Sequence, residues 1–260
     1  MKDHLLQVVS GFEAEERRNR ARDYLQIYIL RLMHEAGAHR HVAFIGGTAL
    51  RLLYELPRFS EDLDFSLMED FDVARLFQRL KHDLELAGYT VTAKASTRRT
   101  VQNAFLRFEG LPKLIGWSAD PRLALTVKVE INTRLPDGAD TETTLVQRFF
   151  PIALTHYDLP SLFAGKIHAL LARPFTKGRD WFDLVWYLTE KRRLAPNLLL
   201  LENALRQTDL TAIDPRQWRS AISQRLHDLD WERVLNDLRP FVERQSDLEQ
   251  LSPELIEKLL

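Results

Sequence analysis

Two aspartates separated by one residue, Asp62 and Asp64, have a spacing that suits metal chemistry. Leu63 and Phe65 alternate with them, which is typical of a strand with one apolar and one polar face. Successive side chains of a strand point to opposite sides, so we expect both carboxylates on the same side. Adjacent like charges disfavour one another unless a cation lies between them, and oxygen ligands suit Mg²⁺, which takes further ligands from substrate phosphates. The pair therefore predicts a site for Mg²⁺ and a nucleotide.

A glycine pair, Gly46 and Gly47, lies between the apolar run Val42–Ile45 and a helical pattern over residues 48–55. Because glycine has no side chain, a triphosphate can approach the backbone amides, and the following helix begins nearby with its positive dipole end. This strand, turn and helix predict a phosphate-binding turn. Taken alone, a glycine pair is more often a plain turn, and an alternating aspartate pair is more often a solvated strand edge.

A third carboxylate, Glu130, lies in a later segment with the same alternation. The apolar residues between Val127 and Ile131 form one face of a predicted strand, and Glu130 lies on the other. If this strand is adjacent to the Asp62 strand, three carboxylates can hold two metal ions roughly 3.5–4 Å apart, one activating a hydroxyl and one bridging a triphosphate. This arrangement predicts phosphoryl-type transfer. The alternative is an ordinary outward face of an antiparallel sheet.

A group of charged residues lies on helical patterns in the C-terminal half. Asp180 and Asp183 are three residues apart on one predicted helix and are therefore neighbours. We expect a Lys or Arg of this group to bind the triphosphate and the aspartates to orient that cation. The alternative is a network of surface ion pairs, each worth only tenths of a kcal/mol. The candidate cations are Lys166, Lys177 and Arg179.

The elements that must position these residues divide the chain into two parts. Strand patterns alternate with helical patterns over residues 1–150, which predicts an N-terminal domain built on a mixed sheet. From Leu159 onward the pattern is helical and is interrupted by prolines, which predicts a helical domain over residues 151–260. The predicted fold class is therefore α+β. The predicted strands lie around residues 42–45, 63–67, 89–92, 104–108 and 123–131.

Composition excludes several classes of protein. The chain is 45% hydrophobic and 28% charged with a formal net charge of −1, which is typical of a globular protein and excludes a globally basic nucleic-acid coat. The absence of Cys excludes disulfides, zinc-thiolate sites and iron–sulfur clusters. The N-terminus is not typical of a signal peptide, and no apolar run has the length of a bilayer span. We therefore expect a cytoplasmic protein without a membrane partner.

In combination, these motifs resemble the AbiEii/AbiGii toxin family of nucleotidyltransferases, within the DNA polymerase β-like superfamily. The resemblance covers residues 40–190 and implies a nucleotidyltransferase domain followed by a helical domain that contributes to the active site. It rests on four groups of residues: Gly46-Gly47-Thr48-Ala49-Leu50, Arg58-x-Ser60-x-Asp62-Leu63-Asp64, Lys128-x-Glu130, and Lys166 with Lys177-x-Arg179-Asp180-x-x-Asp183.

The resemblance also implies a role for each matched residue. It implies catalytic roles for Asp62, Asp64, Glu130, Lys166 and Asp180, the first three as ligands of Mg²⁺, with two ions expected. It implies nucleotide binding by Gly46, Gly47, Thr48, Arg58, Ser60, Lys177, Arg179 and Asp183. Two positions depart from the family pattern: Glu130 replaces the usual Asp, and Arg179 rather than Lys precedes Asp180. Whether Lys177 or Arg179 contacts phosphate therefore stays open.

The expected activity is transfer of a nucleoside monophosphate from an NTP to an acceptor hydroxyl. The resemblance implies an RNA acceptor, such as tRNA, and a toxin of a toxin–antitoxin or phage-defence system with a cognate antitoxin. Two alternatives are a module that binds a nucleotide or a partner without turnover, and a metal-dependent phosphodiesterase. The RNA product distinguishes the three activities, because it is extended, unchanged or shortened, respectively.

Overall fold

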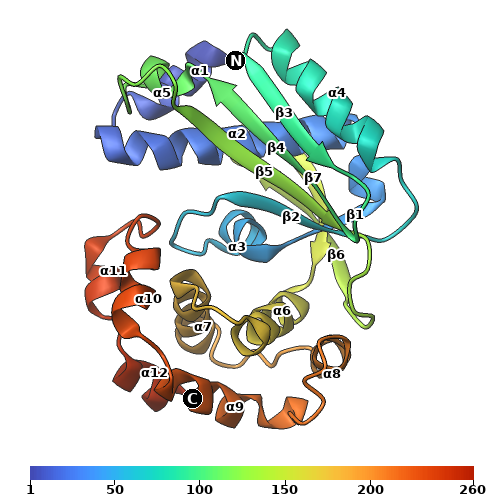
Figure 1. Cartoon of the computed structure of the whole chain (residues 1–260), viewed down its shortest axis with the longest axis vertical. Helices are drawn as coiled ribbons and strands as arrows, with labels where there is room; N and C mark the ends of the chain where they lie inside the picture. Colours follow the sequence, from blue (N-terminus) through green and yellow to red (C-terminus); the bar gives the residue numbers. More distant parts are fainter. The chain divides into compact units, whose positions relative to one another are not determined.

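The computed structural model describes residues 1–260 and has the predicted α+β fold. Seven strands form one mixed sheet in the order β3-β4-β5-β2-β1-β7-β6, and the chain then continues as helices (Figure 1). The chain divides into two compact units. The sheet unit comprises residues 1–53, 60–134 and 143–156, and the helical unit comprises residues 54–59, 135–142 and 157–260.

All five predicted strands are present, together with two that the sequence pattern did not reveal. The additional strands, β6 and β7, form one edge of the sheet. β6 is mostly exposed and rich in Thr, so it lacks an apolar alternation, and β7 begins at Pro151, where a missing N–H is tolerated. The strands are β1 Val42–Ile45, β2 Asp62–Leu67, β3 Val91–Ser96, β4 Val101–Glu109, β5 Ala124–Asn132, β6 Thr141–Gln147 and β7 Pro151–Tyr157.

Helices cover one face of the sheet and leave the polar residues of β2 and β5 on the other. Leu63 and Phe65 of β2 are buried, as are the apolar residues of β5, which confirms the predicted faces of both strands. α2 and α4 pack against β5 and β3 and against each other (Figure 1). The helices before β7 are α1 Lys2–Val9, α2 Ala14–Glu35, α3 Gly46–Tyr54, α4 Val73–Leu86 and α5 Leu111–Leu114, with a 3₁₀ turn at Ala38–Arg40.

In the helical unit, α7 packs between α6, α10 and α12. Trp181 and Leu184 of α7 are buried, and Tyr187 stacks on Phe163 of α6 with ring centroids 4.1 Å apart. This packing brings the charged residues of α6 and α7 together. None of the helices is both long enough and apolar enough to span a membrane. The helices are α6 Leu159–Ala172, α7 Gly178–Glu190, α8 Leu198–Gln207, α9 Trp218–His227, α10 Trp231–Leu238, α11 Gln245–Glu249 and α12 Pro253–Leu259, with a 3₁₀ turn at Pro215–Gln217.

Candidate active site

The three predicted carboxylates of the sheet unit lie on two adjacent strands. β2 pairs with β5 in parallel, and the register places Asp64 opposite Glu130 and Asp62 opposite Lys128. Because residues in register point to the same side, the three carboxylates share the polar face of the sheet. The two strands are therefore adjacent, which is the condition on which the meeting of the three carboxylates depended. β5 pairs with β2 in parallel and with β4, on its other side, in antiparallel fashion.

The glycine turn brings bare backbone against one of these carboxylates. Gly46 begins α3 with a φ of +79°, and a Cβ placed there would lie 2.5 Å from the Asp64 Oδ2 atom. Thr48, which is fully buried, donates its hydroxyl to the backbone carbonyl of Asp62 at 2.5 Å. The predicted succession of strand and helix is confirmed, but both glycines lie in the first turn of α3 rather than in a separate turn before it, and the hydroxyl of Thr48 joins the start of α3 to the start of β2.

Replacing Gly46 by alanine should impair the site beyond its effect on stability. The positive φ costs an alanine about 1 kcal/mol or more, and the new Cβ must displace the Asp64 carboxylate. Gly88→Ala is the matched control, because Gly88 has a φ of +89° and no neighbour within 4 Å of its Cβ position. We expect both variants to lose thermal stability, but only Gly46→Ala to lose NTP binding in a titration. Equal NTP binding by the two variants would contradict this account of the turn.

Lys128 is the counter-ion of the carboxylate group. Its ammonium forms an ion pair and a hydrogen bond with Glu130. Burial acts to lower the pKa of Lys128, but the hydrogen bond and the charges of Glu130, Asp62 and Asp64 outweigh burial and raise it. Sequence reasoning gave Lys128 no role, although its position two residues before Glu130 on the same strand face was a visible signal.

The carboxylates of β2 and β5 provide part of a binding site for a divalent cation. Asp62 and Asp64 offer oxygen ligands on one partly exposed face, beside a turn that leaves no side chain over Asp64, and this donor set suits Mg²⁺. Glu130 is paired with Lys128, and the structure contains no group of three acidic or histidine side chains in metal-binding proximity. The three carboxylates therefore share a face and offer the ligand type that Mg²⁺ prefers, but Glu130 is engaged by Lys128 and the complete predicted metal set is not assembled.

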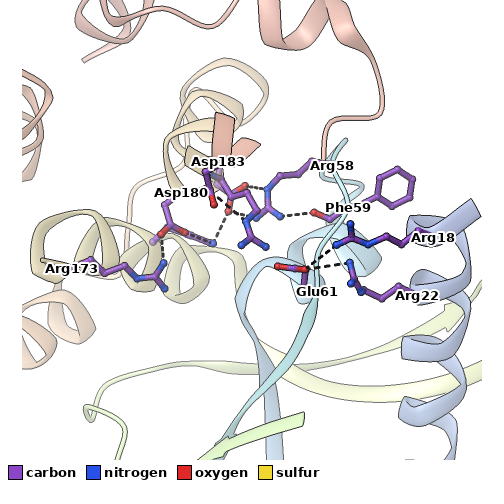
Figure 2. A network of polar contacts seen from close by, with 11 residues as sticks. Arg18, Arg22, Arg58, Phe59, Glu61, Arg173, Asp180 and Asp183 are labelled. Carbon is purple, nitrogen blue, oxygen red and sulfur yellow. Dashed lines mark hydrogen bonds and ion pairs between the residues drawn. The ribbon is translucent and has the colours of Figure 1, made fainter. Parts of the chain in front are cut away.

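The helical unit holds a second charged group, centred on Asp183. This carboxylate is fully buried and receives both the Arg58 Nε and Nη2 atoms at 2.6 Å, a bidentate pair (Figure 2). The Lys166 ammonium lies 2.6 Å from the same carboxylate. Arg58 is 2% exposed, and its Nη1 atom donates to the carbonyl of Phe59. The Arg58 guanidinium was predicted to bind a nucleotide, but it is buried and bonds to Asp183 and Phe59 instead.

Asp180 extends this group toward the surface. Lys166 Nζ donates to its Oδ1 atom at 3.0 Å, and Arg173 Nη1 to its Oδ2 atom at 2.6 Å. Burial acts to raise the pKa of Asp180, but the charges of Lys166, Arg173 and Lys177 lower it to about 2. A network of exposed ion pairs is therefore wrong for this helix, since Asp180 is 2% exposed. Lys166 is held between two buried carboxylates.

Acid should remove the contribution of Asp180 to stability. An aspartate in the unfolded chain has a pKa of about 3.9, whereas the pKa of Asp180 in the folded protein is about 2. The ionised carboxylate therefore stabilises the fold above pH 4 by roughly 2 kcal/mol. This stabilisation is lost as the pH falls from about 4 to about 2. Asp180→Asn resembles the protonated form. We expect the wild type to exceed Asp180→Asn in urea midpoint at pH 6, with about half of that difference at pH 3 and little of it at pH 2. A pH-independent difference would contradict the lowered pKa.

Lys177 and Arg179, the two cations that the sequence offers as a phosphate ligand, have different surroundings in the structure. Arg179 forms an ion pair with Asp237 at 3.7 Å and lies over the Phe241 ring. The Lys177 ammonium makes no hydrogen bond or ion pair, and burial together with the charges of Arg179, Arg173 and Lys166 lowers its pKa against the opposing effect of Asp180. It lines a small, open hollow on the surface of the helical unit, together with Arg173 and Asp180. The geometry therefore favours Lys177 as the cation available to a phosphate.

The predicted site residues thus fall into two groups, each assembled within one unit. Ser60 has no side-chain hydrogen bond, and its carbonyl accepts from Gln26. Its neighbour Glu61 pairs with Arg18 and Arg22 of α2 (Figure 2). The sheet unit holds Gly46, Gly47, Thr48, Ser60, Asp62, Asp64 and Glu130, and the helical unit holds Arg58, Lys166, Lys177, Arg179, Asp180 and Asp183.

Two solved structures from Helicobacter pylori are similar to this chain. The first, described as a candidate nucleotidyltransferase, is 20% identical, with 93% of this chain and 91% of the other covered and a TM-score of 0.53. The second, JHP933, is 21% identical, with 91% and 90% covered and a TM-score of 0.47. At such identities the first likeness concerns the fold alone. A comparison with curated proteins finds no match.

A family model supplies the functional assignment. Residues 28–253 match the model described as the nucleotidyl transferase AbiEii toxin of type IV toxin–antitoxin systems. The match includes the glycine turn, all three carboxylates of the sheet unit and the buried ion pairs of the helical unit. This chain therefore belongs to the AbiEii family of nucleotidyltransferase toxins.

Proposed function

We propose that this protein transfers a nucleoside monophosphate from an NTP to a hydroxyl of RNA, with tRNA as the acceptor. Family membership gives the nucleotidyltransferase activity, the NTP substrate and an antitoxin partner. The observation that supports the site is the register of Asp64 opposite Glu130, with Asp62 on the same face and the bare turn at Gly46 beside Asp64. In the proposed reaction the acceptor oxygen bonds to the α-phosphorus, and the bond to pyrophosphate breaks.

The residues of the sheet unit bind and activate the reactants. Asp62 and Asp64 hold Mg²⁺, with a second ion proposed, and the metal supplies charge neutralisation of the triphosphate and a lowered pKa of the acceptor hydroxyl. The backbone at Gly46 and Gly47 accommodates the phosphates. Glu130, once released by Lys128, takes up the proton of the acceptor hydroxyl. Lys128 is then free to pair with phosphate.

The residues of the helical unit stabilise the charge that develops on the leaving pyrophosphate. Lys166 is the proposed catalytic cation, and Asp180 orients it. Arg58 and Asp183 hold Lys166 in place rather than contacting the nucleotide, which revises their expected roles. Lys177 is the proposed phosphate ligand, and Arg179 is held by Asp237.

Incubation of the purified protein with total tRNA, Mg²⁺ and each α-labelled NTP in turn tests this proposal. We expect label in RNA of increased length with one or more NTPs, and no label when EDTA replaces Mg²⁺. Shortened RNA would indicate a phosphodiesterase instead. NTP binding without any labelled product, with every RNA tried, would indicate a binding module and would overturn the proposed transfer.

A further inference from the structure

The polar face of the sheet extends beyond the carboxylates of β2 and β5 across two further strands, β4 and β3. The register of β2, β5, β4 and β3 aligns Asp62, Lys128, Phe105 and Lys94 in one row. Neighbouring strands lie about 4.8 Å apart, so this row spans about 14 Å from Asp62 to Lys94. Arg107 lies two residues beyond Phe105 on the same face of β4. β2, β5, β4 and β3 are successive neighbours in the sheet (Figure 1), so the row is unbroken from β2 to β3.

An exposed aromatic ring lies in the middle of this surface. Phe105 is 39% exposed, whereas its neighbours Ala104 and Leu106 are fully buried on the opposite face. The Lys128 ammonium lies 5.8 Å from the centre of its ring. Phe105 is the large aromatic side chain of this otherwise polar face, and its ring offers a flat apolar surface on which another ring can stack.

Unpaired cations surround the ring on the side away from the carboxylates. Lys94 and Arg107 are exposed and make no side-chain hydrogen bond or ion pair. The turn between β3 and β4 adds Arg98 and Arg99, which are also exposed and unpaired. The surface is therefore acidic at β2 and basic at β3 and β4. Its basic end fits a polyanion, and its acidic end fits the metal-dependent step proposed above.

We propose that this face, named the Phe105 surface and formed by Lys94, Phe105, Arg107 and Lys128, binds a single-stranded end of the acceptor RNA. An aromatic platform flanked by cations is the combination that binds unpaired nucleotides, because every base can stack and every phosphate can pair. A base on Phe105 lies about 10 Å from Asp62, two strands away, which places the terminal hydroxyl toward the carboxylates. The inference rests on the proposed function for the identity of this RNA as the acceptor.

The composition of the Phe105 surface favours RNA over a protein partner. Protein interfaces have an apolar centre formed by several side chains and are depleted of lysine. The Phe105 surface offers one ring among three cations. A double-stranded RNA would hide its base faces and leave Phe105 without a stacking partner.

Fluorescence anisotropy with a labelled single-stranded RNA of about 12 nucleotides, without NTP or metal, tests this inference. We expect Phe105→Ala to weaken binding about tenfold, and Phe105→Tyr to retain it because stacking is preserved. Arg107→Ala should reduce the slope of log Kd against log salt by about 0.7, whereas Phe105→Ala should leave the slope unchanged. Thermal midpoints establish that each variant is folded.

Two exposed residues elsewhere provide matched controls. Phe175→Ala removes a ring that is 63% exposed in the helical unit, and Arg75→Ala removes an exposed cation of α4 in the sheet unit. Neither should change RNA affinity by more than about twofold. Wild-type affinity in Phe105→Ala, or no binding by the wild type, would overturn the inference and leave a protein partner as the occupant. If RNA binds through Phe105 but is never extended, the proposed nucleotide transfer is overturned while the inferred RNA-binding surface stands.

Discussion

Asp62→Asn and Asp64→Asn should each lower the rate of nucleotide transfer by at least about a thousandfold. Each substitution keeps the shape of the side chain and removes a charged metal ligand. Metal stabilisation of transition-state charge amounts to several kcal/mol, and about 4 kcal/mol corresponds to a thousandfold in rate. Label incorporation from the NTP accepted by the wild type, measured with saturating tRNA and Mg²⁺, provides the rate.

These two variants should remain folded, which separates a catalytic loss from a structural one. Asp62 and Asp64 are partly exposed, and removing one of several neighbouring anions relieves repulsion in the metal-free protein. We expect thermal midpoints within a few degrees of the wild type. Asp70→Asn, an exposed aspartate just beyond β2, is the matched control and should retain full activity. Full activity in either Asp62→Asn or Asp64→Asn would refute the metal assignment.

Asp183→Ala should destabilise the protein by about 3–5 kcal/mol. The substitution leaves the Arg58 guanidinium buried without its bidentate partner and removes one of two carboxylates from Lys166. An uncompensated buried charge carries a penalty of this size. Urea unfolding, followed by circular dichroism, measures the loss. Asp237→Ala is the control, because Asp237 is about one-third exposed and its pair with Arg179 at 3.7 Å should contribute less than about 1 kcal/mol.

A double variant distinguishes the structural role of this pair from its positioning role. Arg58→Met with Asp183→Leu removes both buried charges, and such a replacement often restores or exceeds the original stability. We expect the double variant to be more stable than Asp183→Ala but still poor in transfer, because Lys166 keeps only Asp180 as its anchor. A double variant with wild-type kcat would mean that the Arg58–Asp183 pair serves stability alone.

The chemistry of the sheet unit was accessible from the sequence because it follows from strand periodicity. Alternation places Asp62 and Asp64 on one face and Glu130 on the corresponding face of a later strand, without any knowledge of the fold. Their meeting required the two strands to be adjacent, and the parallel register of Asp64 with Glu130 provides this. The pairing of Glu130 with Lys128 instead depends on side-chain conformation and was not predicted.

The chemistry of the helical unit was accessible only in part. A spacing of three residues correctly made Asp180 and Asp183 neighbours, but it cannot distinguish an exposed stripe from a buried one. The burial of Asp183 depends on Arg58, which is 125 residues away in the sequence. No local sequence pattern indicates a partner at such a distance along the chain. Arg173 is only seven residues before its partner Asp180, but it lies between α6 and α7, where no helical spacing links the two residues, and it was not identified as a site residue.

The division of the chain into units has a consequence for synthesis. The helical unit takes the segments 54–59 and 135–142 from within the N-terminal half, so the chain passes between units five times. At translation speeds of about 5–20 residues per second, Arg58 is synthesised roughly 6–25 s before Asp183. The buried pair that anchors Lys166 therefore forms only on a nearly finished polypeptide, and a protein truncated after residue 156 would carry a guanidinium with no counterpart.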